Sequence, residues 1–217
     1  MTQQLTALFL SAFVTFLVVI DPPGCAPIFA SLTSGTSPAH RRAMALRSTM
    51  VAGSVLLVFS LFGEKLLDLL GISLAAFRTA GGIMLFLIAI DMVFETRTQR
   101  REERAEEISK RAAVESRPLE AEDISVFPMG IPMIAGPGSI ATAMLLTSRA
   151  EGWMQGAVVL AALAATLLLT LLALLAAGPM MKALGHSIEA MITRVLGVIL
   201  AALAAQFVID GIKASFA

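Results

Sequence analysis

The stretch VVIDPPGCAPIF, residues 18–29, places a carboxylate and three prolines inside an otherwise apolar segment. A second apolar segment carries IPMIAGPGSI, residues 131–140, and the Pro-Gly pairs of the two stretches stand 114 residues apart. Proline lacks an N–H and glycine permits unusual dihedral angles, so each stretch predicts the end of one half-helix and the start of another. Non-helical backbone at membrane depth persists only where protein or a water-lined cavity satisfies it. Two such breaks at matching places favour a transport site built from discontinuous helices.

Composition indicates a membrane protein. Apolar residues make up 57% of the 217 residues, and the mean hydropathy is +0.84. The run AALAATLLLTLLALLAA, residues 161–177, exceeds with its flanks the roughly 20 apolar residues that span the hydrocarbon. The N-terminus has no basic region before its apolar run, so we expect a first span and not a removed signal peptide. The net charge of zero predicts no nucleic-acid partner.

The hydrophobic pattern predicts an all-α membrane protein with six transmembrane helices, the first and fourth broken at the Pro-Gly motifs. Their expected positions are 4–34, 43–63, 72–94, 124–148, 154–177 and 188–210. Residues 1–94 would form a first three-helix repeat and residues 124–217 a second, joined by a charged linker at 95–123. With Pro23-Gly24 placed on Pro137-Gly138, residues 32–34 and 146–148 both read Leu-Thr-Ser. Because each half has three spans, the halves must face opposite ways, which predicts an inverted-topology repeat.

The positive-inside bias predicts the orientation of the chain. With both termini in the periplasm, twelve basic residues fall on the cytoplasmic side and four on the other. Most of the twelve belong to the linker, which is therefore expected to be cytoplasmic, and we expect a multi-pass protein of the bacterial inner membrane.

Each half-helix that starts after a break would present free N–H groups and the positive end of its dipole, which suit a carboxylate. The half-helix before the break exposes carbonyls that can hold a cation, so a zwitterionic amino acid would satisfy both ends. The candidate solute- or ion-binding residues are Asp21, Pro22, Pro23, Gly24, Pro27, Ala135, Gly136, Pro137, Gly138, Ser139, Thr142, Arg78 and Arg194.

For several of these candidates we consider both a structural and a binding role. Asp21 immediately precedes proline, so it is either a helix cap or a membrane-embedded carboxylate that binds or carries H⁺ or Na⁺. Arg78 and Arg194 either extend to the membrane surface or pair with Asp21 or a solute carboxylate. The hydroxyls of Ser139 and Thr142 either contact solute or bond back to the preceding turn.

Enzymatic and metal-binding signatures are weak. His40 and His186 have no ligands at metal-site spacing, and neither a G-x-S-x-G elbow nor a P-loop occurs. We therefore expect no catalytic residue, no metal and no cofactor, with H⁺ or Na⁺ as candidate coupling ions. The expected partners are the lipid bilayer and a small-molecule solute, and a homo-oligomer is left open.

The combined motifs resemble one known family. They are DPPG-x-x-PIF at 21–29, GISL at 71–74, R-x-x-GG at 78–82 and IP-x-x-AGPG at 131–138. Together they are similar to the MarC family of bacterial inner-membrane proteins, and more widely to the LysE-type exporters. One MarC-like branch is associated with transport of small neutral amino acids. The resemblance thus implies a secondary transporter or exporter of a small polar metabolite, plausibly a neutral amino acid, working by alternating access. The alternatives are a channel, a lipid-handling protein or a non-transporting membrane protein with a stress-related role.

Overall fold

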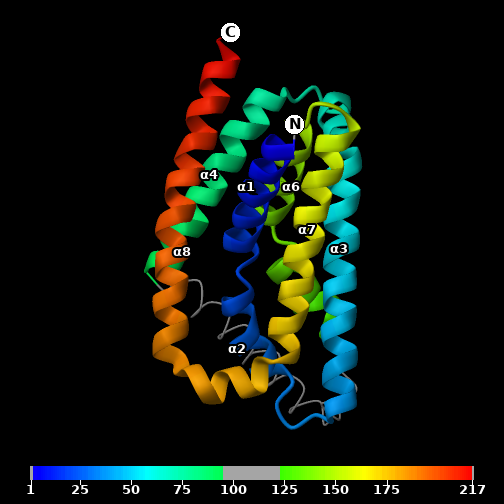
Figure 1. The fold of residues 1–217 in the computed structure, drawn as a ribbon, viewed down its shortest axis with the longest axis vertical. Helices are drawn as coiled ribbons and strands as arrows, with labels where there is room; N and C mark the ends of the chain where they lie inside the picture. Colours follow the sequence, from blue (N-terminus) through cyan, green and yellow to red (C-terminus); the bar gives the residue numbers. More distant parts are fainter. Residues whose placement is uncertain (1, 95–122, 217) are drawn as a thin grey trace.

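The computed structural model describes residues 2–94 and 123–216, with the side chains of 179–190 left out. The predicted linker at 95–123 therefore lies, except for Asp123, outside the described residues. The elements are all helical, and no strand occurs in the described ranges. In chain order they are α1 (Thr2–Ile20), α2 (Pro22–Leu32), α3 (Pro38–Leu69), α4 (Leu74–Val93), η2 (Ser125–Ile134), α6 (Pro137–Ser148), α7 (Gly152–Leu175) and α8 (Ala177–Ser215). Figure 1 shows an elongated bundle with both chain termini at the same end.

Within the described residues, five segments are long and apolar enough to cross a membrane, and a sixth is added if η2 and α6 are one span bent by 56°. The span from Thr2 to Leu32 combines α1 and α2. Helix α3 is 32 residues long and extends beyond the predicted 43–63 at both ends. Its start lies earlier because Ser37 caps it and Pro38 occupies the first helical position. The all-helical membrane fold predicted from the sequence is confirmed at this level.

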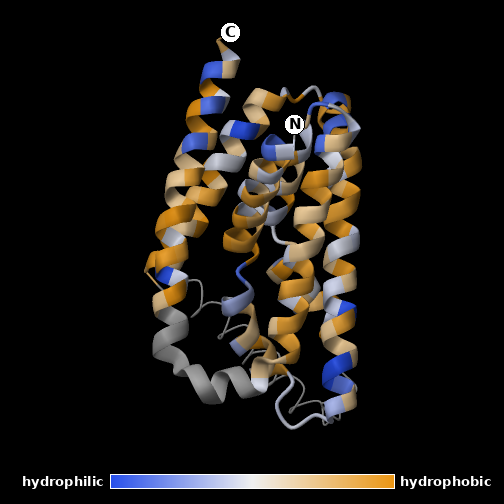
Figure 2. Cartoon of the chain, in the orientation of Figure 1, coloured by the Kyte–Doolittle hydropathy of each residue, from blue (hydrophilic) through white to orange (hydrophobic). Residues whose placement is uncertain are grey.

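The surface of the bundle is strongly apolar. Many large hydrophobic side chains are exposed, among them Met50 at 68%, Leu87 at 58% and Val198 at 61%. Figure 2 shows the hydrophilic colour mainly near the two ends of the bundle and at the α1–α2 junction, with apolar helices between them. An exposed apolar surface of this extent is what a lipid-facing helix bundle requires.

Helices α4 and α8 pack antiparallel along a seam of glycines. A Cβ added at Gly82 would lie 2.8 Å from the Val208 side chain and 2.9 Å from the Ala204 carbonyl. A Cβ added at Gly197 would lie 3.1 Å from the Val93 side chain and 3.2 Å from the Ala89 carbonyl. The absence of a side chain at both positions lets the two backbones approach closely.

The first helices of the two halves pack on the second helices of the opposite halves. Helix α1 lies against α7, and α3 lies against both η2 and α6. Helix α6 is nearly enclosed, since it also contacts α1 and α4 and its buried positions run from Gly138 to Leu145. The interrupted elements are therefore inside the bundle, where neighbouring helices surround them.

Candidate functional site

The α1–α2 junction is closed by Asp21. This residue is 1% exposed, adopts the left-handed conformation at φ 58° and ψ 65°, and separates the two helices. Its Oδ1 accepts the Gly24 N–H at 3.1 Å, and its carbonyl accepts the Cys25 N–H at 3.0 Å. A Cβ at Gly24 would lie only 2.2 Å from Asp21 Oδ2. The carboxylate thus folds onto the start of α2, and only glycine leaves it room there.

The buried end of α1 is followed by two prolines, which have no N–H to donate. In a continuous helix the carbonyls of Val18 and Val19 would accept the N–H groups of residues 22 and 23, but both are prolines. The Gly24 N–H is taken by Asp21, and the Ile20 carbonyl instead lies 3.5 Å from the Cys25 thiol. A carbonyl-rich helix end beside a buried carboxylate suits a cation.

The second junction has an irregular approach. In η2 the Met129 N–H bonds the Ile124 carbonyl and the Ala135 N–H bonds the Gly130 carbonyl, both across five residues. The backbone is extended at Phe127 and Ile131, each of which precedes a proline. This conformation follows from the clash between a proline ring and the backbone of the residue before it. Helix α6 then begins at Pro137 with Gly136 as its N-cap.

The two junctions lie next to each other inside the bundle. A Cβ at Gly138 would be 2.6 Å from Ile88, 3.2 Å from Leu85 and 3.5 Å from Val19. Val19 is two residues before Asp21, so the start of α6 touches the end of α1. In Figure 1 both junctions lie near the middle of the long axis. The tertiary structure therefore brings the end of α1 and the start of α6 together, with Gly138 against Val19.

The helix starts match with an offset of 115 residues and not with the 114 used for the sequence pairing. Asp21 and Gly136 are the N-caps, and Pro22 and Pro137 are the first helical residues. An offset of 115 matches Asp21 with Gly136, whereas the offset of 114 matches it with Ala135. The two halves thus differ at the cap: the first carries a carboxylate, and the second has no side-chain cap.

Other sequence candidates are placed elsewhere. Arg78 lies near enough to Arg149 and Asp210 for electrostatic interaction, at the end of the bundle where the termini lie. Arg194 is exposed on α8, one turn before Gly197 and hence beside the end of α4. The remaining candidates, Pro27, Ser139 and Thr142, are buried in α2 and α6.

An ionic cluster near that end was not among the candidates. Arg149 Nη2 bonds Asp210 Oδ2 at 2.8 Å, Gln206 donates to Asp210 Oδ1 at 2.7 Å, and the Arg149 guanidinium lies 5.1 Å from the centre of the Phe207 ring. The members come from the end of α6 and the last turns of α8. Residues 61 positions apart have no local pattern that predicts such a pair.

At the opposite end Asp123 precedes η2. Its carboxylate accepts the Ser125 hydroxyl, and also the Ser125 N–H at 2.9 Å. These hydrogen bonds, the hydroxyl first, together with Arg47 at 3.3 Å, lower the pKa of Asp123 below its ordinary value. The pair ties the start of η2 to α3.

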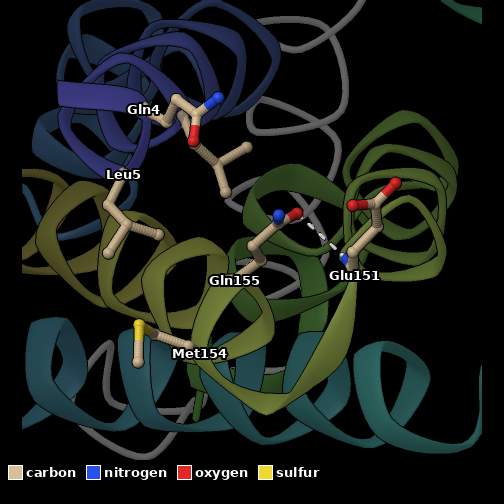
Figure 3. Close-up of a pocket in the computed structure, with 6 residues that line it drawn as sticks. Gln4, Leu5, Glu151, Met154 and Gln155 are labelled. Carbon is tan, nitrogen blue, oxygen red and sulfur yellow. Dashed lines mark hydrogen bonds between the residues drawn. The ribbon is translucent and has the colours of Figure 1, made fainter. Parts of the chain in front are cut away.

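A surface pocket of about 500 Å³ lies between the starts of α1 and α7. Figure 3 shows Gln4 and Leu5 facing Met154 and Gln155, with the Gln155 side chain bonded to the Glu151 N–H at 3.0 Å. The pocket is also lined by Leu8, which is 13 residues before Asp21 and so about 20 Å away along a helix. It therefore opens at the end of the bundle, away from the paired junctions.

The helices, their apolar exterior and the buried interruptions define a multi-pass integral membrane protein. The family model of the MarC family integral membrane protein matches residues 6–216. The chain therefore belongs to the MarC family, as the sequence motifs predicted.

Several relatives cover nearly the whole chain. The inner membrane protein YhgN of Escherichia coli K12 is 36% identical over 94% of this chain and 95% of its own length. The membrane protein YvbG of Bacillus subtilis is 35% identical over 94% and 93%, and a membrane protein of Archaeoglobus fulgidus is 34% identical over 94% and 92%. No solved structure matches the chain. Family membership and these relatives make the chain an integral, multi-pass inner-membrane protein.

Proposed function

We propose that the protein is a secondary transporter of a small polar or zwitterionic metabolite, plausibly a neutral amino acid, that works by alternating access. The observation that carries this proposal is the contact between the two buried junctions: Gly138 at the start of α6 lies against Val19, two residues before the buried carboxylate of Asp21. A carbonyl-rich helix end and a helix start with free amides thus meet inside an apolar bundle. Such a pair of opposite dipole ends is suited to a zwitterion.

Two inverted three-helix repeats, residues 1–94 and 124–217, would form the moving halves. The α4–α8 seam supports this division, because its contacts are reciprocal under the same offset of 115 residues. Gly82 faces Ala204 and Val208, and Gly197 faces Ala89 and Val93. Adding 115 to 82, 89 and 93 returns 197, 204 and 208. A two-fold relation between the halves produces such paired contacts, and local sequence similarity alone does not.

In this mechanism the halves rock about the seam and expose the junctions to either side in turn. The Ile88 and Leu85 side chains close on Gly138, so the described conformation keeps the junction shut. Asp21 would carry the coupling H⁺ or Na⁺ as the buried carboxylate beside the α1 carbonyls. We further propose periplasmic termini and a cytoplasmic linker at 95–123.

Counterflow into proteoliposomes tests the function. Vesicles loaded with an unlabelled neutral amino acid should accumulate the labelled one when the wild-type protein is present. Gly138→Leu should abolish this flux, because its side chain would enter the contact with Ile88, Leu85 and Val19. Gly156→Leu is the matched control, since no atom lies within 4 Å of the position that its Cβ would take.

Failure of every solute in the panel to exchange through the wild-type protein would reject transport of this class. Exchange that persists in Gly138→Leu at the wild-type rate would reject the junction as the site. Asp21→Asn should remove the dependence of the flux on the H⁺ or Na⁺ gradient, and an unchanged dependence would exclude Asp21 from coupling.

A further inference from the structure

The two buried helix starts differ in how their amides are satisfied. At α2, Pro22 and Pro23 have no N–H, and the next two amides bond the carboxylate and the carbonyl of Asp21. At α6, Pro137 has no N–H, and the Ile140 N–H bonds the Gly136 carbonyl at 3.0 Å. The amides of Gly138 and Ser139, between them, have no hydrogen-bond partner among the described residues. The amides at the start of α2 are satisfied by Asp21, and those of Gly138 and Ser139 at the start of α6 have no partner among the described residues.

This open helix start is not on the molecular surface. Gly138 is buried and Ser139 is 3% exposed. Buried backbone amides without a partner are rare in folded proteins, because each one forfeits its hydrogen bond to water without replacement. Two in succession, at the positive end of a 12-residue helix, require a partner that the described chain does not supply.

Thr142 adds an independent sign of a missing partner. Its side chain is fully buried and its hydroxyl has no hydrogen bond. The buried helical threonines Thr15, Thr166 and Thr170 return their hydroxyls to the carbonyl four residues earlier at 2.8–3.0 Å, whereas Thr193 shares the unpaired state of Thr142. Thr142 does not bond the Gly138 carbonyl in this way. A buried hydroxyl that makes no local bond costs stability unless something else occupies it.

The hydroxyl and the free amides belong to the same turn of α6. Cα–Cβ bonds in an α-helix tilt toward its N-terminus, so the Thr142 side chain lies over the turn that begins at Gly138. Gly138 has no side chain to cover that turn. The groups that close on it are the terminal methyls of Ile88 and Leu85, which can rotate away.

We propose that the start of α6 is the carboxylate subsite of the solute site, with the Gly138 and Ser139 amides and the Thr142 hydroxyl as its donors. This inference rests on the proposed transport function. It gives the site a polarity: the solute carboxylate binds the second half of the chain, and its cationic group faces the α1 carbonyl end and Asp21 in the first half. Asp21 already occupies the equivalent position at α2, so the substrate class is a zwitterion with a single carboxylate.

Thermal unfolding of the purified, detergent-solubilised protein tests this assignment independently of transport. Glycine, L-alanine and L-serine are titrated beside their amides, which keep the ammonium group and lack the carboxylate. At least one of the acids should raise the unfolding temperature, and its amide should not. Thr142→Val should raise the half-saturating concentration of that acid by about tenfold, the effect of losing one hydrogen bond to a charged group.

Thr166→Val is the matched control, because Thr166 is equally buried but its hydroxyl is satisfied by Ala162. It should bind with wild-type affinity. If Thr142→Val does not fold, Thr142→Ser and Thr142→Ala form a pair that differs only in the hydroxyl, and the serine variant should bind about tenfold more tightly.

Equal binding of acids and amides, or equal affinity with and without the Thr142 hydroxyl, would overturn the subsite. If the same amides also exchange in counterflow, transport stands while the carboxylate assignment falls. If no acid stabilises the protein but acids exchange through it, the subsite falls alone. If none stabilises and none exchanges, both proposals fall.

Discussion

Asp21 and Gly24 constrain each other at a buried polar position of the first half. The carboxylate can lie on the start of α2 only because residue 24 has no Cβ, and the left-handed backbone of Asp21 turns its side chain back onto its own helix. The helix-cap reading of Asp21 therefore describes a hydrogen bond in this structure, and its ion-carrying role remains a proposal. The two roles concern the same carboxylate, whose two oxygens together offer about four acceptor positions.

Gly24→Ala should break the hydrogen bond between the Asp21 carboxylate and the N–H of residue 24. The added methyl group would stand 2.2 Å from Asp21 Oδ2, so the carboxylate must leave the cap. We expect a loss of about 1–2 kcal/mol in the free energy of unfolding, the usual range for a lost N-cap. Thermal unfolding in detergent measures it, with Gly156→Ala as the control, because alanine there meets no atom within 4 Å. An unfolding temperature equal to that of the wild type would show that the cap contributes nothing.

At the scale of elements, the two helix junctions and the α4–α8 seam have different structural roles. The α1–α2 and η2–α6 junctions break the regular helix near the middle of the long axis of the bundle. Helices α4 and α8 each continue without such a junction and pack beside each other. The seam depends on close approach at two glycines that face both side-chain and backbone atoms of the opposite helix. Close contacts of this kind hold the helix pair together where lipid supplies no hydrophobic driving force.

Alanine at Gly82 or Gly197 should therefore destabilise the protein. Each Cβ would approach the facing helix to within 2.8–2.9 Å, and overpacking of this kind costs about 1–3 kcal/mol. Gly82→Ala should have the larger effect, since it meets the Val208 backbone nitrogen as well as side-chain atoms. Unfolding of both variants beside Gly156→Ala measures this. Destabilisation by only one of the two glycine substitutions would count against a reciprocal seam.

For the whole molecule, the common end of the two termini has a consequence for its orientation in the membrane. Residues 3 and 215 lie on the same side in the structure, and the distribution of basic residues places that side in the periplasm. Gln3→Cys and Ser215→Cys, each in a Cys25→Ala background, should both react with a membrane-impermeant thiol reagent added to intact cells. Protection of both until the cells are opened would reverse the proposed orientation, and reaction of only one would contradict an even number of spans.

Much of the architecture follows from local sequence, and the site follows from contacts between distant residues. The apolar runs predict the membrane helices, and the helix boundaries at Ile20 and Ile134 fall inside the two stretches that contain proline and glycine. Proline and glycine act on the backbone of their own turn, so their effect on a helix can be predicted from the local sequence alone. The same local chemistry predicts that residues before Pro128 and Pro132 leave the helical conformation, as the structure has them.

Only the tertiary structure decided what those segments meet. It placed Gly138 against Val19, paired Arg149 with Asp210, set Gly82 and Gly197 against the facing helices of the seam, and left the Thr142 hydroxyl without a hydrogen bond while Asp21 capped the start of α2. Each of these depends on how helices pack, because apolar faces rich in alanine and leucine permit several registers with similar local sequence. The sequence by itself thus determined that the chain is an all-helical membrane protein of the MarC family, because long apolar runs and the quoted motifs are local properties. The packing of distant helices determined that the start of α6 lies against the end of α1.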